Sequence, residues 1–189
     1  MDRRLFVTVA AAGSLLAVTG CTTTPDAPTD KATKRREIDA ASDAALTRLA
    51  QTVPDSRNLA ARSRGILVFP NVLAGGFVVG GEYGDGVLRV QGRSAGYYRT
   101  LAGTLGFQIG GQSKAIIMMF MTPEALEKFR SSEGWSVGGD ASVAVAKIGA
   151  NGEIDTTTAS QSVVAFVMTN AGLMANLNLQ GSKITKLDL

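Results

Sequence analysis

The sequence predicts an α+β fold in which amino-terminal helices precede a β-rich, curled antiparallel sheet, sandwich-like or barrel-like, with one inserted helix. Three observations predict it. A helical pattern comes first, before Gly65. β-branched and aromatic runs bounded by glycines dominate after Gly65. Three segments share the form apolar-Gly-Gly-polar, and paired glycines within strands typically mark bends of a sheet: Val79–Glu82, Ile109–Gln112 and Val137–Asp140.

Composition excludes several chemistries. The 189 residues include no histidine and one cysteine, so the chain has no Ser-His-Asp or Cys-His nucleophile system, no histidine-containing zinc site and no internal disulfide. The chain is 45% hydrophobic and only 19% charged, which is enough apolar material for a sizeable core. The formal net charge of +3 gives little support to nucleic acid as a partner, and we expect none.

Residues 1–20 have the layout of a secretory signal peptide. A short charged start precedes the apolar stretch Leu5–Val18, which is too short to span a bilayer comfortably. The residues before Cys21, Val18-Thr19-Gly20, resemble the bacterial lipobox, whose cysteine becomes lipidated. We therefore predict a covalent lipid anchor at Cys21. Arg3-Arg4 is also compatible with a twin-arginine signal, so the export route stays open.

Residues 21–32 are predicted to be the lipidated cysteine and a tether, and residues 33–189 to be the folded domain. Thr22–Asp30 is rich in Thr, Pro and Asp without an apolar period. At ~3.3 Å per residue it reaches roughly 30 Å, so the domain would stay close to the membrane.

Two helices are predicted next. The first runs from about Ala32 to Gln51, with Asp30 as its cap and Pro54 beyond its end. The second runs from Ser56 to Arg62, with Asp55 as its cap. One apolar stripe follows the first helix: Ile38, Ala41, Ala45, Leu46 and Leu49.

The rest of the chain is predicted to be mainly strands. Gly84-Asp85-Gly86 is predicted to form a hairpin turn between two of them. Thr122-Pro123 is predicted to begin the inserted helix, since Thr caps helices and Pro suits a first turn. Asn151-Gly152 is a predicted turn. The strand patterns cover residues 66–69, 77–79, 87–90, 115–120, 135–147, 162–168, 173–179 and 184–187.

Catalytic motifs are weak. Gly92–Gly96 fits the G-x-S-x-G pattern of serine hydrolases around Ser94, but the chain has no histidine, so a hairpin loop is the better interpretation. A Ser-Lys pair with Lys114 or Lys147 stays conceivable. Carboxylates near turns lack calcium-loop spacing and are interpreted as solvated, so no metal site and no cofactor are predicted: Asp85, Asp140, Glu153 and Asp155.

Basic residues gather at the amino end of the first predicted helix, where the helix dipole disfavours positive charge. Local helix stability does not explain them, whereas anionic headgroups near a tethered domain would. A solvated, solubilising helix face is the alternative. The first group is Lys31, Lys34, Arg35 and Arg36, and a second follows at Arg57, Arg62 and Arg64.

Four segments resemble, in order, those of the SYLF domain family. They are Ser63–Pro70 (SRGILVFP), Gly75–Gly81, Gly103–Gln112 and Trp135–Ser142. The resemblance extends over roughly residues 33–189. It implies a non-catalytic domain that binds lipid, with some members binding actin.

The resemblance also implies which residues contact lipid. Headgroups would meet Lys34, Arg35 and Arg36, and acyl chains would meet Ile38, Leu46 and Leu49. We expect a bacterial envelope lipoprotein that binds anionic phospholipid membranes. We expect it to be sorted to the outer membrane and to face the periplasm, because Thr22 rather than Asp follows the anchor. The alternative is an interaction module for an envelope or host protein, for example actin. An enzyme is a distant third and rests on Ser94 alone.

Overall fold

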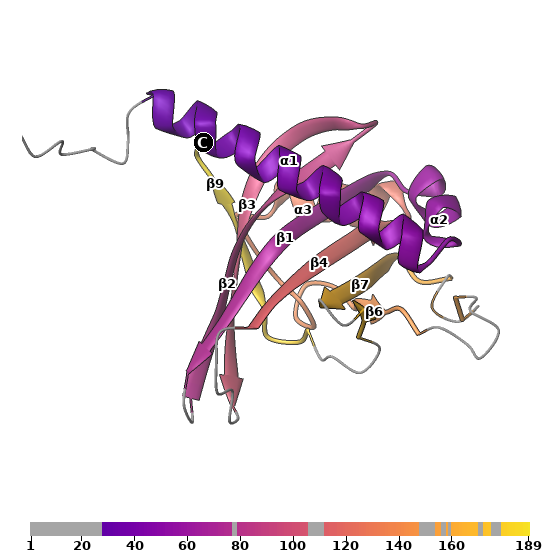
Figure 1. The fold of residues 1–189 in the computed structure, drawn as a ribbon. Coiled ribbons are helices and arrows are strands. Elements are labelled where there is room, and N and C mark those ends of the chain that lie inside the picture. Colours follow the sequence, from indigo (N-terminus) through magenta and orange to yellow (C-terminus); the bar gives the residue numbers. More distant parts are fainter. Residues whose placement is uncertain are drawn as a thin grey trace, which may run out of the picture.

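Helix α1 (Pro28–Thr52) lies across one face of a curled sheet, and α2 (Ser56–Arg62) follows it at one end (Figure 1). In this computed structural model the described residues are 28–76, 79–105, 112–147, 154–155, 158, 160–169, 172–174 and 179–189. Helix α3 (Pro123–Ser131) is inserted after the fourth strand. Within these residues no helix is both long and apolar enough to cross a membrane.

The strands run in the order β5-β9-β3-β2-β1-β4-β7-β6, with β8 paired to β7. The described pairs are antiparallel except β6 with β7, which is parallel. The α+β prediction with a curled, mostly antiparallel sheet is therefore confirmed. The strands are β1 (Gly65–Gly76), β2 (Val79–Val90), β3 (Arg93–Leu105), β4 (Gln112–Phe120), β5 (Gly134–Ser136), β6 (Ala144–Val145), β7 (Val163–Thr169), β8 (Gly172–Leu173) and β9 (Lys183–Leu187).

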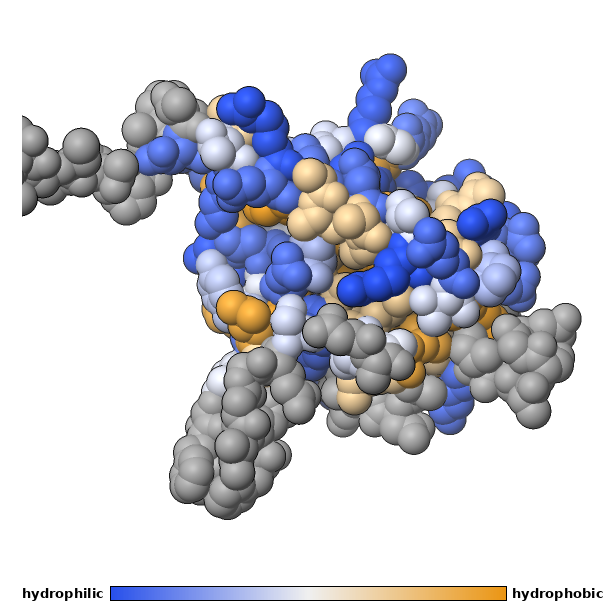
Figure 2. All heavy atoms as spheres, in the orientation of Figure 1, coloured by the Kyte–Doolittle hydropathy of each residue, from blue (hydrophilic) through white to orange (hydrophobic). Residues whose placement is uncertain are grey.

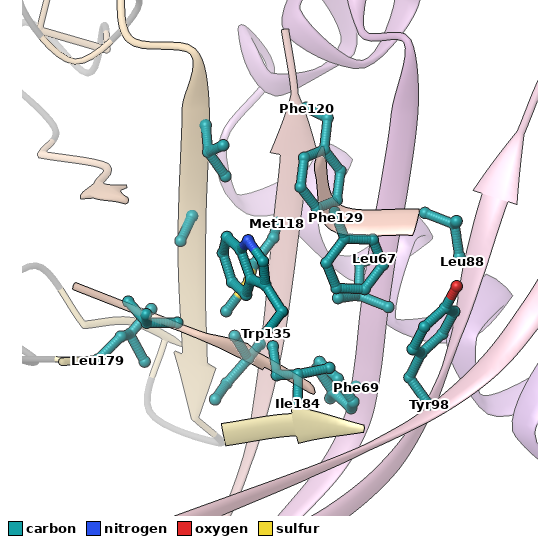
Figure 3. Packing of buried hydrophobic residues seen from close by; sticks show 14 of the residues in the cluster. Leu67, Phe69, Leu88, Tyr98, Met118, Phe120, Phe129, Trp135, Leu179 and Ile184 are labelled. Atoms are coloured by element: carbon teal, nitrogen blue, oxygen red, sulfur yellow. The ribbon is translucent and has the colours of Figure 1, made fainter. Parts of the chain in front are cut away.

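Each face of the sheet carries a core. On the face opposite α1, here the inner face, Phe129 of α3 packs between Tyr98, Phe120 and Trp135, with ring centroids 4.8, 5.0 and 5.5 Å away (Figure 3). On the other face, here the helix face, residues of α1 and α2 pack on strands β1, β4 and β7. That second cluster includes Ala45, Leu49, Val53, Leu59, Val68, Ile117, Met119, Val164 and Phe166.

A buried ion pair joins two strands across β1. Lys114 Nζ lies 2.6 Å from Glu82 Oε1, and the two side chains are about 10% exposed. Because each charge compensates the other, both can lie on the inner face without facing water. Lys114 is thereby engaged away from Ser94, and the conceivable Ser-Lys pair between these two is not formed.

The predicted caps and bounds of the helices are found in part. Thr122 Oγ1 accepts a hydrogen bond from the Ala125 amide at 3.2 Å, as a capping threonine does, so that prediction is confirmed. The second helix also has its predicted bounds, but Asp55 makes no capping bond and instead accepts from Asn58 Nδ2. Helix α1 starts at Pro28, four residues before the predicted Ala32. Proline suits the first turn of a helix, and α1 begins at Pro28. Asp30 therefore lies within the helix and does not cap it.

The hairpin predicted at Gly84-Asp85-Gly86 is wrong, because these residues lie in the middle of β2. A Cβ on Gly86 would lie 2.5 Å from the Phe69 ring and closer still to the Val68 carbonyl oxygen. Glycine is therefore needed there for close approach to β1. The turn between β2 and β3 comes at Gln91 and Gly92, whose φ angles are +51° and +75°.

The single strand predicted over residues 135–147 is also wrong. It consists of β5 and β6 with a turn between them, where Gly138 has φ of +90°. The three Gly-Gly segments are accordingly not equivalent, since one lies in β2, one in this turn, and Gly110-Gly111 lies outside the described residues. The predicted turn at Asn151-Gly152 lies outside them as well, and of the strand predicted over 173–179 the structure describes β8 alone.

Candidate functional site

Three of the four basic residues at the start of α1 contact other parts of the domain. Lys31 Nζ lies 3.2 Å from Asp188 Oδ2, and Lys34 Nζ lies 2.8 Å from Asp85 Oδ2. Arg35 donates a hydrogen bond to the backbone carbonyl of Leu189. Arg36 is exposed and bonds within its own helix turn. These contacts fasten the amino-terminal part of α1 to β2 and to the residues that follow β9. They account for three of the four positive charges that the helix dipole disfavours.

Asp85 is the centre of one of these contacts. Its carboxylate accepts from Arg99 at 2.7 and 3.1 Å and from the Tyr83 hydroxyl at 3.2 Å. Burial raises the pKa of Asp85, but the hydrogen bonds from Arg99 and Lys34 outweigh it and hold the pKa below its ordinary value of 3.8. The Arg99 guanidinium also lies 4.7 Å from the centre of the Tyr83 ring. The interpretation of Asp85 as a solvated turn carboxylate is therefore wrong.

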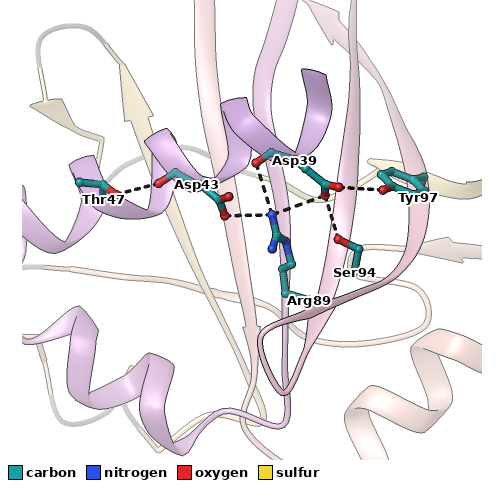
Figure 4. A network of polar contacts seen from close by, with 6 residues as sticks. All are labelled: Asp39, Asp43, Thr47, Arg89, Ser94 and Tyr97. Atoms are coloured by element: carbon teal, nitrogen blue, oxygen red, sulfur yellow. Dashed lines mark hydrogen bonds and ion pairs between the residues drawn. The ribbon is translucent and has the colours of Figure 1, made fainter. Parts of the chain in front are cut away.

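A second network joins α1 to strands β2 and β3 (Figure 4). Arg89 Nη2 lies 2.9 Å from an Asp43 carboxylate oxygen and 3.4 Å from one of Asp39. The Asp39 carboxylate accepts from the Ser94 and Tyr97 hydroxyls at 2.9 and 3.0 Å. Burial and the hydrogen bond to Asp39 raise the pKa of Tyr97. Sequence reasoning missed this network because residues 39 and 97 become neighbours only in the fold.

The network also bears on the G-x-S-x-G segment. Ser94 lies at the start of β3, next to the β2–β3 turn, rather than between a strand and a helix. Its hydroxyl donates to a carboxylate that Tyr97 also binds, so Ser94 helps to dock α1. Among the described residues no group of three Cys, Asp or Glu side chains could hold a metal ion.

The apolar stripe of α1 faces the sheet. Ile38 and Leu49 are 7% and 1% exposed, and Leu46 is half-buried against the helix-face cluster that contains Leu49. The acyl-chain role implied for these three residues conflicts with this packing, because a docked α1 buries them. They would meet a membrane only if α1 left the sheet.

The second basic group lies at α2 and the start of β1. Arg57, Arg62 and Arg64 are exposed, and within the described part of the chain no acidic partner is found for them. Arg62 Nε contacts only the Asn58 carbonyl of its own helix. Arg64 also lines an open groove of about 440 Å³ between α1, α2, β1 and β2. Arg89 of β2 lines the same groove.

A comparison with known protein families finds a match for the carboxyl-terminal part of the chain. Residues 101–188 match the family model Ysc84, described as "Las17-binding protein actin regulator". This match is consistent with the resemblance of the chain to the SYLF domain family. SYLF domains bind lipids and actin and are not known for catalysis. A comparison with curated proteins finds no match.

The SYLF match begins inside β3 and runs through β9. Helices α1 and α2 and strands β1 and β2 precede it, although β1 and β2 lie in the middle of the same sheet. The segments Gly103–Gln112 and Trp135–Ser142 fall within the match. Ser63–Pro70 and Gly75–Gly81, which resemble the start of the domain, lie before it.

Proposed function

We propose that this protein is a non-catalytic lipoprotein of the bacterial envelope whose SYLF domain binds anionic phospholipid membranes. Cys21 would carry the lipid anchor after removal of residues 1–20, and the domain would face the periplasm from the outer membrane. Resemblance to a family of lipid-binding domains supports membrane binding. The lipobox-like residues before Cys21 support the anchor.

The uneven pairing of the basic residues carries the headgroup-binding part of this proposal. Lys31 and Lys34 already have carboxylate partners, whereas none is described for Arg57, Arg62 and Arg64. A cation near an anionic membrane gains about 1 kcal/mol. We therefore assign headgroup contact mainly to these three arginines, with Arg36 as an exposed addition. We assign Lys31, Lys34, Arg35, Ile38, Leu46 and Leu49 to the docking of α1.

Vesicle co-sedimentation tests this assignment. The protein is residues 21–189 carrying Cys21→Ser, which retains every described element but no acyl anchor. Replacing Arg57, Arg62 and Arg64 with Gln should weaken binding to phosphatidylglycerol vesicles about 100-fold at low salt, since three contacts of about 1 kcal/mol are lost. Moderate salt should weaken wild-type binding as well.

The control is a second triple replacement with the same change in net charge. Arg130, Lys147 and Lys186 are exposed and lie in α3, after β6 and in β9. Changing them to Gln should leave most of the binding intact. An equal loss in both triple variants would show that net charge, and not the α2 surface, controls binding. No wild-type binding to anionic vesicles would refute the proposed function.

A protein partner is the second candidate function. It is favoured by the description of the matched family as a Las17-binding protein and actin regulator. Co-sedimentation with filamentous actin, in the absence of vesicles, tests it. Binding of actin that survives the loss of Arg57, Arg62 and Arg64 would support this function over headgroup recognition.

A further inference from the structure

Three exposed apolar side chains form one row across the helix face of the sheet. Leu73, Tyr83 and Leu101 are 56%, 41% and 45% exposed. Leu73 pairs with Tyr83 across β1 and β2, and Tyr83 pairs with Leu101 across β2 and β3. Of the large hydrophobic side chains that the structure describes as exposed, only Met174 lies outside this row.

The row is flanked by polar side chains on one side and by glycines on the other. Asp85 and Arg99 form the adjacent row, where Lys34 of α1 binds. On the other side, Gly75, Gly81 and Gly103 are aligned in register. A Cβ on Gly75 or Gly103 would meet nothing within 4 Å. The space-filling view shows an apolar area below the amino-terminal part of α1, one of several on this face (Figure 2).

The composition of the row is that of an interfacial membrane contact. Lys183 of β9 pairs with Leu101 and extends the row by an exposed cation. Leucines can enter the acyl region, tyrosine has an apolar ring with a polar end, and lysine can reach headgroups from a partly buried stem. Lys34, Arg99 and Lys183 outnumber Asp85, so the area is also electrostatically complementary to an anionic surface.

The anchor predicted at Cys21 would keep this face near a bilayer. Helix α1 begins at Pro28, so the intervening chain reaches roughly 23 Å at ~3.3 Å per residue. Lys34, in the second turn of α1, contacts the row next to Leu73, Tyr83 and Leu101. The amino-terminal end of α1 thus brings the anchor and the apolar row to the same side of the molecule.

We propose that Leu73, Tyr83 and Leu101 enter the interfacial region of an anionic phospholipid bilayer, with Lys183 at the headgroups. This inference rests on the proposed function and adds an apolar contact to it. The contact requires no movement of α1, because the row is exposed while α1 is docked. Binding would then have two components, one sensitive to salt through the arginines and one resistant through this row.

A fluorescent label tests the contact directly. In residues 21–189 with Cys21→Ser, Leu101→Cys becomes the sole cysteine and carries an environment-sensitive fluorophore. Vesicles of equal parts phosphatidylglycerol and phosphatidylcholine should shift its emission to the blue, while pure phosphatidylcholine should not. The control label is placed at Glu124→Cys on α3, which packs on the inner face, and its emission should stay unchanged.

A pair of variants measures the contribution to binding. Leu73→Ser with Leu101→Ser should weaken vesicle binding about tenfold at moderate salt, whereas Met174→Ser, at the remaining exposed apolar site, should not. Trp135 fluorescence checks that each variant is folded. Protein that co-sediments with vesicles while its Leu101 label stays unchanged would overturn this inference and leave the proposed function standing. Failure to co-sediment at all would overturn both.

Discussion

At the scale of single residues, Asp85 illustrates what sequence reasoning missed. Its place between two glycines suggests a solvated turn, but it lies within β2 and binds Lys34, Arg99 and Tyr83. These partners are brought to it by α1 and β3, so no local pattern could reveal them. The basic cluster of α1 is visible in the sequence because its members are close together. Its role is not visible there, because its partners lie far along the chain.

Asp85→Asn should destabilise the protein by about 2 kcal/mol at pH 7, because it removes the charge that Lys34 and Arg99 bind. The pKa of Asp85 is lowered in the folded state, so its carboxylate stabilises the fold above the ordinary value of 3.8. That stabilisation is lost as the pH falls through the lowered pKa. Urea unfolding, followed by the fluorescence of Trp135, should therefore show a wild-type advantage at pH 7 that shrinks towards pH 3. An advantage of equal size at both pH values would contradict this role.

At the scale of elements, local signals predicted what depends on neighbours in sequence. The start of α3 at Thr122-Pro123 was predictable because both the cap and the proline act within one helical turn. The glycines of β2 were misread because a glycine that allows close packing and a glycine that allows a turn look alike in sequence. Only the position of β1, with its irregular pairing between Val68 and Leu73, distinguishes them.

Two glycine-to-alanine substitutions separate these roles. Gly86→Ala should destabilise the protein by roughly 1–3 kcal/mol, since the new methyl would overlap Phe69 and the Val68 carbonyl. Gly103→Ala has open space and should stabilise by up to about 1 kcal/mol, because alanine loses less backbone freedom on folding. Thermal unfolding of both variants measures the difference. Similar melting temperatures for the two would contradict the packing explanation.

At the scale of the whole molecule, the fold class was predictable and the strand order was not. Runs of β-branched residues revealed most strands, yet nothing in residues 183–187 indicates that β9 pairs with both β3 and β5. The candidate site was likewise predictable only in part. Basic and apolar residues of α1 stand out in the sequence, but the fold uses most of them for docking. The exposed row of Leu73, Tyr83 and Leu101 exists only through strand register.

Removing residues 183–189 should disrupt the whole domain and not merely one edge. It leaves β3 and β5 without their common neighbour and removes Ile184 from the core that contains Trp135. Lys31 and Arg35 also lose their contacts with Asp188 and Leu189. We expect the truncated protein to lose cooperative thermal unfolding, measured by circular dichroism and Trp135 fluorescence. A sharp transition near the wild-type temperature would show that β9 is dispensable.

The pairing of Lys31 with Asp188 also has a consequence for when the protein folds. These residues are separated by 157 positions, and β9 joins a strand that precedes it by more than eighty residues. Contacts of such sequence separation make folding slow, and here they cannot form until residues 183–188 have been synthesised. Until then one edge of β3 in the nascent protein has no neighbouring strand, and chaperones bind such exposed edges.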